Sequence, residues 1–337
     1  MEIYYREYEE GKVFEKVYFS RIIIDSYREN IINKIIHKFL YIKLYKYIIG
    51  NGYNFIYLRY SRDANPALIY FLKKLKKKGI KVIIEFPNYP YDEEQIPQNF
   101  FEKISIWLDK KYRKKLKYYV EKAVVFADEK EAFGISTISL ENGINLDKIK
   151  LINKENKKDI NLIIVANIQD YHGCDRVILS LREFYKKNRN EDVYFHIIGD
   201  GDKKVILKLK NQVKENNMEK YIIFYGNKSG EELEKIYDKV DLGVGCLGLF
   251  RAKSDKTSAL KHREYCAKGI PFMIAGLDKS FNSCDFVYSV SNDESLLDIE
   301  KIIKWYKNLK VTPEEIRKYA EDNLTWDKQM KKVIDNI

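Results

Sequence analysis

Short apolar runs alternate with longer amphipathic segments from about residue 54 to residue 275, and this alternation restricts the possible folds more than any other feature of the chain. Continuous runs of Val, Ile, Phe and Tyr are typical of strands buried on both faces of a parallel sheet, and the segments between them predict connecting helices. In the first half, strands are expected at 55–59, 82–86, 123–126 and 137–140, and Asn65 is expected to cap a helix that opens with Pro66.

The second half restarts the same pattern after the polar stretch 153–159. Strands are expected at 161–166, 194–199, 221–225, 241–245 and 271–275, and helices from about residue 294 to the end. These are the parts of a doubly wound lobe, in which ligands bind beyond the carboxyl ends of the strands. We expect an α/β protein with one Rossmann-like lobe over 1–145, a second over 146–310 and C-terminal helices over 311–337 that cross back to the first lobe.

The chain is basic, with 61 Lys and Arg residues against 50 Asp and Glu and a net charge of +11. A basic surface attracts nucleic acids and anionic membranes. No basic-aromatic nucleic-acid motif accompanies the charge, so we expect no nucleic-acid partner. Many of the basic residues form two clusters in the first half of the chain. We expect these clusters either to contact a membrane or to form solvated faces of helices. They consist of Lys73, Lys74, Lys76, Lys77, Lys78 and Lys81, and of Lys110, Lys111, Arg113, Lys114, Lys115, Lys117 and Lys122.

The four cysteines lie far apart, and the sequence suggests no signal peptide, so a reducing cytoplasmic location is expected. The longest apolar run, 31–49, is interrupted by charged residues, which argues against a membrane span. The four histidines are not spaced as metal ligands, so no protein-held metal is expected.

The segment 258–272 has the layout of a nucleotide-sugar site. A helix starting near Ser258 would direct its N–H groups and positive dipole end at a phosphate. Glu264, nearly two turns further on, could accept hydrogen bonds from sugar hydroxyls.

Glu264, Ala267, Gly269 and Pro271 match in register the donor-site signature of family 4 retaining glycosyltransferases. The wider segment resembles the bacterial capsular and exopolysaccharide branch, and the resemblance covers roughly residues 54–290. It implies a GT-B fold, in which two Rossmann-like lobes face each other across a cleft. Asn142-Gly143-Ile144-Asn145 resembles the Asn-Gly-Ile-Asp segment that connects the first lobe to the second in this family.

The resemblance implies transfer of a sugar from a nucleoside diphosphate to a polysaccharide or lipid-linked oligosaccharide. The transfer is expected to retain the stereochemistry of the sugar and to need no metal or other cofactor. The enzyme is expected in the cytoplasm, in association with the inner face of the membrane. Glu264 would bind the donor ribose; an ion pair with Lys268 is its alternative role. The family's partner Glu is replaced by Lys256, for which Asp255 is a neighbouring substitute. Ser258, Ala259 and Leu260 would bind the donor at the helix start.

Two loops are expected to approach the donor phosphates. His172 and Gly173 stand where the family has Lys-Gly. The alternative is a salt bridge between Asp175 and Arg176, with His172 capping the helix. The Gly199-Asp200-Gly201 loop allows close backbone approach to a ligand, although a tight turn would explain it equally well.

Arg251 and Lys261 are expected to neutralise the leaving diphosphate, because retaining transfer builds negative charge on that group. For Arg251 the alternative is a surface salt bridge with Asp255. For Lys261 it is a solvated helix face.

In the first half, Glu85, Asn88 and Tyr89 belong to a segment similar to one in capsular glycosyltransferases, and they are acceptor or cleft candidates. The alternative is a loop that packs its Tyr side chains on its own core. Residues 1–30 are strongly charged where the family opens with an apolar strand, so the first lobe is expected to lack its first βα unit. This departure and Lys256 keep a second function open, an inactive scaffold that binds nucleotide or stabilises a partner glycosyltransferase.

Overall fold

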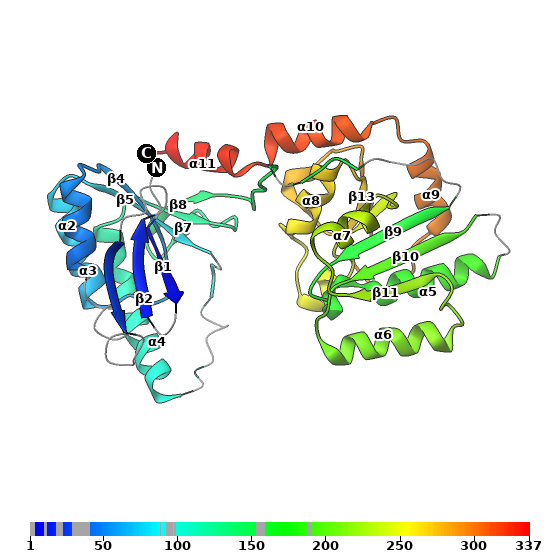
Figure 1. The fold of residues 1–337 in the computed structure, drawn as a ribbon, viewed down its shortest axis with the longest axis horizontal. Helices are drawn as coiled ribbons and strands as arrows, with labels where there is room; N and C mark the ends of the chain where they lie inside the picture. Colours follow the sequence, from blue (N-terminus) through cyan, green and yellow to red (C-terminus); the bar gives the residue numbers. More distant parts are fainter. Residues whose placement is uncertain are drawn as a thin grey trace. The chain divides into compact units, whose positions relative to one another are not determined.

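The computed structural model describes residues 4–9, 12–17, 23–28, 41–87, 89–91, 97, 99–147, 149–152, 159–187 and 191–337, with side chains from residue 41 onward. The chain forms two compact units, each with its own parallel sheet (Figure 1). Unit 1 comprises Met1–Leu140 and Lys332–Ile337, and unit 2 comprises Glu141–Lys331. Among the described helices, none combines the length and the apolar character that a bilayer crossing requires.

The sheet of unit 1 has the strand order β4-β5-β6-β8-β7, and all neighbours are parallel except β7 and β8. The strands predicted for the first half are present. The bounds are β4 Phe55–Arg59, β5 Lys81–Phe86, β6 Lys122–Val125, β7 Glu131–Ala132 and β8 Ile135–Ser139, and the helices are α2 Ile42–Gly50, α3 Pro66–Lys77, α4 Phe100–Tyr112 and the 3-10 helix η2 Arg113–Tyr118.

Helix α3 begins where the sequence predicts. The Asn65 side chain accepts hydrogen bonds from the backbone N–H groups of Ala67 and Leu68, at 2.9 and 3.1 Å, and Pro66 takes the first helical position. Pro fits there because its missing N–H would have no partner inside the helix. The helix buries Leu72 and its neighbours in the core of unit 1.

The first strands of the chain form a separate antiparallel sheet of β1 Tyr4–Glu9, β2 Lys12–Val17 and β3 Ile23–Arg28. These strands were not predicted, because their charged residues interrupt any apolar run. Antiparallel strands tolerate such residues, since one side of the sheet can face solvent. Among the described residues, no strand of the parallel sheet precedes β4. The described residues thus agree with the expectation that the first βα unit is lacking, and they contain an antiparallel sheet in that part of the chain.

Unit 2 contains a fully parallel sheet with the order β11-β10-β9-β12-β13-β14. Five of its strands were predicted, and the edge strand β14 was missed. The strand bounds are β9 Ile160–Val165, β10 Val193–Ile198, β11 Ile222–Gly226, β12 Leu242–Val244, β13 Phe272–Ala275 and β14 Val287–Val290. The helix bounds are α5 Cys174–Tyr185, α6 Lys203–Glu215, α7 Gly230–Tyr237, α8 Leu260–Lys268, α9 Ile299–Lys307, α10 Pro313–Asn323 and α11 Trp326–Ile334, which ends in unit 1.

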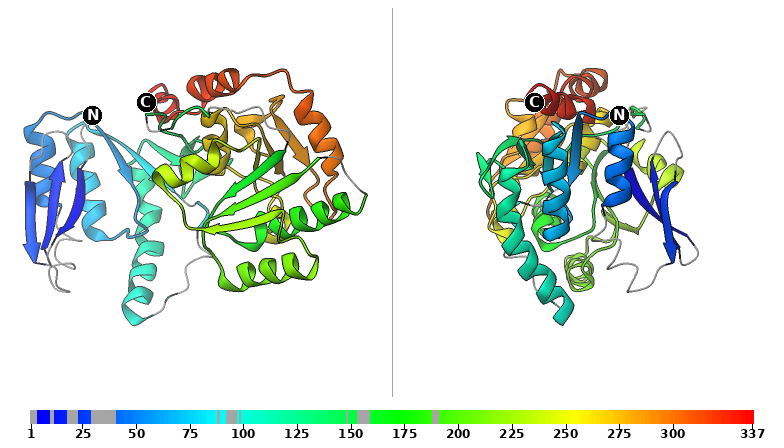
Figure 2. Two further views of the ribbon diagram at one scale, coloured as in Figure 1. Left: turned by 45° about the vertical axis from the view of Figure 1, so that its right-hand side comes forward. Right: turned by 90° about the vertical axis from the view of Figure 1, so that its left-hand side faces the viewer.

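Helices cover both faces of this sheet (Figure 2). Consecutive residues of β9 point to opposite cores: Leu162 packs in the core that contains residues of α5, α6 and α9, and Ile163 in the core that contains residues of α7, α8 and α10. The strand order reverses between β9 and β12. In a doubly wound sheet such a reversal leaves a crevice at the carboxyl ends of the two strands, where ligands bind. The predicted α/β fold class is confirmed.

Candidate functional site

The loops that follow β9 and β12 meet at the point where the strand order reverses. The N–H of Leu247 donates to the carbonyl of His172 at 3.1 Å, and the N–H of Gly248 donates to that of Tyr171 at 3.0 Å. Gly173 has a φ of 67°, and a Cβ there would lie 2.9 Å from the carbonyl carbon of Leu247. The glycine therefore lets the two loops touch.

His172 is buried in the first of these loops and is neutral. Its Nδ1 accepts a hydrogen bond from the N–H of Gln169 at 2.9 Å and caps the short 3-10 helix Asp170–His172. Burial, and secondarily the charge of Lys261, lowers the pKa of His172 to about 3. Because Nδ1 is an acceptor, the ring proton sits on Nε2. His172 can offer a ligand a hydrogen bond but no positive charge.

Helix α8 begins at Leu260, two residues after the predicted start. Ala259 is its N-cap and supplies no side-chain hydrogen bond, so the first turn keeps backbone donors that a ligand could use. Ser258 instead holds Asn142. Its Oγ accepts from the Asn142 N–H at 3.1 Å, and its carbonyl accepts from the Asn142 side chain at 2.6 Å.

Lys261 lies in the first turn of α8 with its amine buried. Among the described residues the Nζ has no hydrogen-bond partner. Burial lowers the pKa of Lys261, and its charge acts on His172, Cys174 and Cys246 from the two loops. The solvated helix face suggested as its alternative role is wrong. A buried cationic donor without a partner is costly unless an anion binds it.

Glu264 is held by a neighbour from α7. The Tyr237 hydroxyl donates to Glu264 Oε1 at 3.1 Å, and burial raises the pKa of Glu264. The suggested partner Lys268 pairs with Glu234 instead, at 2.7 Å to each carboxylate oxygen, and its Nζ lies 4.3 Å from the centre of the Tyr237 ring.

A buried charge network supports the start of α8, and sequence reasoning missed it. Arg263 contacts both carboxylate oxygens of Asp278, at 2.5 and 3.0 Å, and donates to the Asn142 carbonyl at 3.0 Å. His262 Nδ1 lies 2.8 Å from the same Asp278 carboxylate. Burial alone would raise the pKa of Asp278, but hydrogen bonds from His262 and Arg263 hold it below its usual value. The available signal was a helix of charged residues, 260–268, with no apolar stripe.

Arg251 is engaged by three carboxylates. It forms two contacts with Asp175, at 2.8 and 2.9 Å, reaches Glu294 at 2.6 Å and lies 3.4 Å from Asp170. The hydrogen bonds outweigh its burial and raise the pKa of Arg251. The alternative role given above for Arg251 was a salt bridge with Asp255. Arg251 does form salt bridges, but with these other carboxylates. The salt bridge between Asp175 and Arg176, suggested above as the alternative for the His172 loop, is not formed. Arg176 donates instead to the backbone carbonyls of Ser295 and Ser291.

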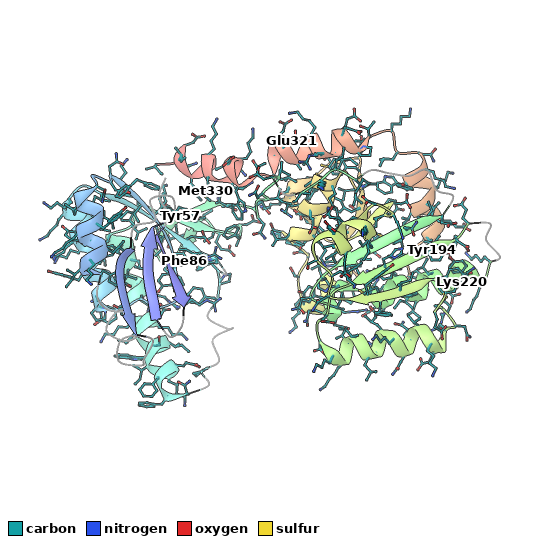
Figure 3. The ribbon with its side chains drawn as sticks, in the orientation of Figure 1. Tyr57, Phe86, Tyr194, Lys220, Glu321 and Met330 are labelled. Atoms are coloured by element: carbon teal, nitrogen blue, oxygen red, sulfur yellow. The ribbon has the colours of Figure 1, made fainter. Side chains whose placement is uncertain are left out.

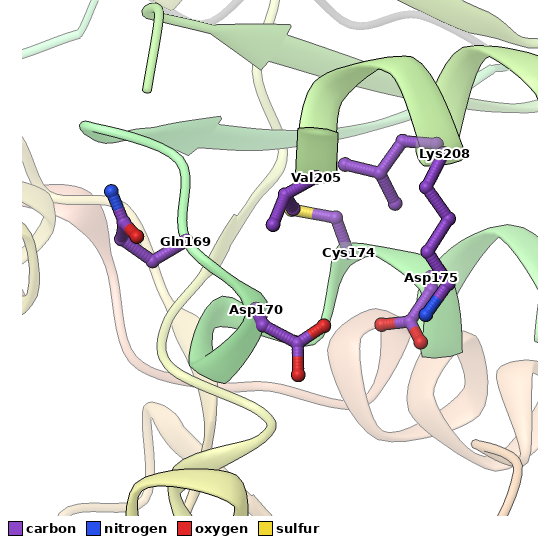
Figure 4. Close-up of a pocket in the computed structure, with 7 residues that line it drawn as sticks. Gln169, Asp170, Cys174, Asp175, Val205 and Lys208 are labelled. Carbon is purple, nitrogen blue, oxygen red and sulfur yellow. The ribbon is translucent and has the colours of Figure 1, made fainter. Parts of the chain in front are cut away.

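A small pocket lies between the first loop and the helices α5 and α6 (Figure 4). It is lined by Gln169, Asp170, Cys174, Asp175, Val205, Lys208 and Leu209. Both of its carboxylates are partners of Arg251, and their charge disfavours a diphosphate there. The amine of Lys261, which has no hydrogen-bond partner within the described part of the chain, therefore marks the more suitable position for an anion.

Gly199 and Gly201 follow β10 and pack against the backbone of the loop after β9. A Cβ on Gly199, whose φ is 113°, would lie 1.9 Å from the carbonyl oxygen of Ala166, and one on Gly201 would lie 2.1 Å from that of Ile168. These close approaches give both glycines a structural role that does not involve a ligand. A role of these glycines in donor binding stays a prediction.

In unit 1, Glu85 is buried near the end of β5 and accepts a hydrogen bond from the Tyr57 hydroxyl at 2.7 Å. Figure 3 labels Tyr57 and Phe86, the residue that follows Glu85. Arg59 Nε lies 3.5 Å from its other oxygen. The Tyr89 ring packs against Phe86 and Phe133, as the packing alternative expected. Asn88, the third candidate, lies outside the described residues.

Residues 146–271 match the family model described as glycosyl transferases group 1. A sequence search of the curated proteins gave no match. Among solved structures, the chain is similar to a glycosyltransferase from Rickettsia africae, with a TM-score of 0.62 and 16% identity over 94% of this chain and 83% of that one.

Two further structures have the same fold. HepE from Anabaena in complex with UDP gives a TM-score of 0.57 at 12% identity, over 87% of this chain and 80% of that one. Sucrose-phosphate synthase from Thermosynechococcus elongatus gives 0.55 at 14%, over 87% and 77%. The chain is therefore a GT-B fold protein that resembles the group 1 glycosyltransferases, and its second unit carries the domain that matches their family model.

Proposed function

We propose that the chain transfers a sugar from a nucleoside diphosphate to a polysaccharide or lipid-linked oligosaccharide, and that the donor binds unit 2 at the start of α8. The observation that carries this proposal is the buried amine of Lys261, which has no hydrogen-bond partner among the described residues. It lies in the first turn of a helix, beside the loop that holds His172. A charged amine, a helix N-terminus and an imidazole N–H together suit a diphosphate.

The proposed mechanism is stabilisation of the leaving diphosphate. Cleavage of the bond between sugar and phosphate transfers negative charge to the phosphate oxygens, so a positive group placed there lowers the barrier. Lys261 supplies the charge. Arg251 would contribute only if its carboxylate partners gave way to the donor. Membership of family 4, retention of stereochemistry and independence of a metal or other cofactor belong to this proposal through the sequence resemblance.

Glu264 is proposed to accept hydrogen bonds from the ribose hydroxyls. This role requires an ionised carboxylate, and the Tyr237 hydroxyl lowers the pKa of Glu264 against the effect of burial. Ser258 is tied to Asn142, so its part would be to hold the loop before α8 in place. Ala259 and Leu260 would present backbone N–H groups.

UDP is the first nucleotide to test. HepE of Anabaena was solved with UDP and with UDP-glucose, and its fold is similar to that of this chain. The acceptor is proposed to contact unit 1 at Glu85, whose buried carboxylate has one oxygen without a hydrogen-bond partner among the described residues. A lipid-linked acceptor would place the enzyme at an anionic membrane surface, in contact with the lysine-rich part of unit 1.

The test is calorimetric titration of the protein with UDP, GDP, ADP and CDP in the presence of EDTA, followed by an assay of labelled sugar nucleotides. Lys261→Met is the test variant, and Lys203→Met, on the exposed start of α6, is the matched control. We expect selective binding of one nucleotide, lost in the Lys261 variant and kept in the control. Absence of binding to all four would overturn the donor site.

The second candidate, an inactive scaffold that supports a partner glycosyltransferase, is favoured by Lys256 in place of the family's Glu and by the antiparallel sheet at the start of unit 1. The two candidates differ in turnover. Binding of a nucleotide without transfer or hydrolysis of any donor across a wide panel would select the scaffold.

A further inference from the structure

Helix α4 exposes a row of large apolar side chains. Phe100 is 70% exposed, Phe101 76%, Ile104 41% and Trp107 59%. Phe100, Ile104 and Trp107 are spaced by four and three residues, so they lie on one face of the helix. Large apolar side chains grouped on a surface mark an interaction site more often than single ones do.

Opposite this row, α4 buries the polar residue Asp109, while the apolar residues Ile106 and Leu108 are half-buried. Asp109 is fully buried, and its carboxylate accepts hydrogen bonds from the Tyr60 hydroxyl and, at 3.0 Å, from the N–H of Ala64. Arg113, one turn further on, is also buried and contacts Asp109 at 3.3 Å. A helix that packs on a core normally turns its apolar face inward. In α4 the buried residue is polar and the largest rings are exposed, so core packing does not account for those rings.

Lysines border the apolar row. Lys111 Nζ lies 4.8 Å from the centre of the Trp107 ring, so the charge sits directly beside the aromatic face. The exposed lysines of this segment are Lys103, Lys110, Lys111, Lys114, Lys115 and Lys117. Arg113, which the sequence grouped with them, is not part of the surface. In both views of Figure 2, helix α4 (teal) extends beyond the sheet of unit 1.

We propose that the exposed face of α4 binds an anionic lipid bilayer, with Phe100, Phe101, Ile104 and Trp107 entering the interface and the lysines contacting lipid phosphates. Helices that lie in a membrane interface combine an aromatic and aliphatic face with flanking lysines. The long lysine stems allow the rings to enter while the amines stay with the headgroups. A nucleic-acid duplex would use the charge but not the adjacent aliphatic and aromatic row, and a second copy of this basic chain would bring lysines against lysines.

This inference assigns a surface to the membrane contact of the proposed function, but it does not require nucleotide binding or transfer. The experiment therefore uses no substrate. Purified protein is sedimented with phosphatidylcholine vesicles that contain or lack phosphatidylglycerol, and the emission of Trp107 is recorded in a Trp305→Phe/Trp326→Phe background. We expect binding only with phosphatidylglycerol, a blue shift of Trp107 emission on binding, and weaker binding at high salt.

Two double variants separate the apolar and the charged contributions. Phe100→Ser/Trp107→Ser should weaken binding to anionic vesicles about a hundredfold, and Lys110→Gln/Lys114→Gln about tenfold. Leu207→Ser is the matched control, because Leu207 is 60% exposed on α6 of unit 2, and it should bind as wild type. Circular dichroism melting checks that all variants fold.

Three outcomes would overturn the inference. The first is no binding to anionic vesicles at low salt, and the second is wild-type binding by the Phe100/Trp107 variant. The third is a dimer in the absence of lipid that this variant abolishes, because the row would then bind a second copy of the chain. Binding of UDP is unaffected in each case, so failure here is distinct from failure of the donor site.

Discussion

The hydroxyl of Tyr237 donates a 3.1 Å hydrogen bond to Glu264 Oε1, and this contact links α7 to the proposed ribose-binding carboxylate. Tyr237 is fully buried, and the Lys268 Nζ lies 4.3 Å from the centre of its ring. A residue of a different helix therefore helps to set the position of the Glu264 carboxylate.

Tyr237→Phe should shift the pH dependence of nucleotide binding. Burial raises the pKa of Glu264 and the Tyr237 hydroxyl lowers it, so removing the hydroxyl raises that pKa further. A carboxylate that accepts ribose hydroxyls must be ionised, so binding weakens as the pH falls through this pKa. The acid limb of UDP affinity should move to higher pH, with less than about a tenfold loss at neutral pH.

Calorimetry from pH 5 to pH 8 measures the shift of that limb. Tyr306→Phe is the control, because its hydroxyl bonds Asp241 rather than Glu264. An acid limb at the same pH in Tyr237→Phe and in wild type would contradict the role of Glu264.

Gly199→Ala should destabilise unit 2 strongly. Its Cβ would have to occupy a point 1.9 Å from the Ala166 carbonyl oxygen, and its φ of 113° is unfavourable for alanine. The expected loss is about 3 kcal/mol or more in the free energy of unfolding.

Gly230→Ala is the matched control, because Gly230 also has a positive φ, 55°, but nothing lies near its Cβ position. It should cost about 1 kcal/mol, the backbone strain alone. Urea unfolding of both variants gives the comparison, and equal losses would show that strain rather than the close approach controls the position.

The parallel strands could be predicted closely from the sequence. The central strands β5, β6 and β9 are nearly continuous apolar runs, because both of their faces are buried. The half-buried edge strand β4 also has the predicted bounds 55–59. β14 was missed because it is a short edge strand with partly exposed residues. The sheet β1–β3 was missed because charged residues obscured its strands.

The site could be predicted only in part. Local spacing placed Lys261 and Glu264 on one helix close to its start. It could not show that Asp175 and Glu294, which are 76 and 43 residues from Arg251, bind that side chain. The same applies to Asp278, which lies 15 residues from Arg263 and meets it only because β13 returns the chain beneath α8. Such pairings depend on tertiary packing, which periodicity does not encode.

Unit 2 should lose stability as the pH falls from about 6.5 toward 4. Burial lowers the pKa of His172 to about 3 and that of His196 to about 4, and it also lowers that of His262. An unfolded histidine titrates near 6.5, so between these values the unfolded chain binds more protons than the folded one. Each histidine should therefore contribute a slope of about 1.4 kcal/mol per pH unit, with stability greatest above pH 6.5.

His196→Gln tests this slope, because glutamine does not titrate and can still bond Asn161 or Tyr225, the present partners of His196. Urea unfolding at pH 5 and pH 7, followed by Trp305 fluorescence with the other two tryptophans replaced by Phe, gives the stability of unit 2. The slope of the variant should be smaller than that of wild type. An unchanged slope would show that His196 titrates at the same pH in the folded and the unfolded chain, which would contradict the lowered pKa.

Lys261→Met should separate stability from binding, and Lys268→Met is its control on the same helix. Both amines are buried, but Lys268 is paired with Glu234, whereas Lys261 has no hydrogen-bond partner among the described residues. Removing an unpaired buried charge relieves a desolvation cost, so the Tm of Lys261→Met should equal or exceed that of wild type. Its UDP affinity should fall about tenfold to a hundredfold, since a charge-assisted contact with phosphate is lost.

Lys268→Met should instead lower the Tm, because it leaves the Glu234 carboxylate without its cation and removes the charge from the Tyr237 ring. Thermal unfolding with and without UDP measures both effects together. UDP should raise the Tm of the control variant and have little effect on Lys261→Met, since stabilisation by a ligand follows its affinity. If Lys261→Met were as unstable as Lys268→Met, the amine would serve packing of the folded chain, and the anion site at the start of α8 would have to be placed elsewhere.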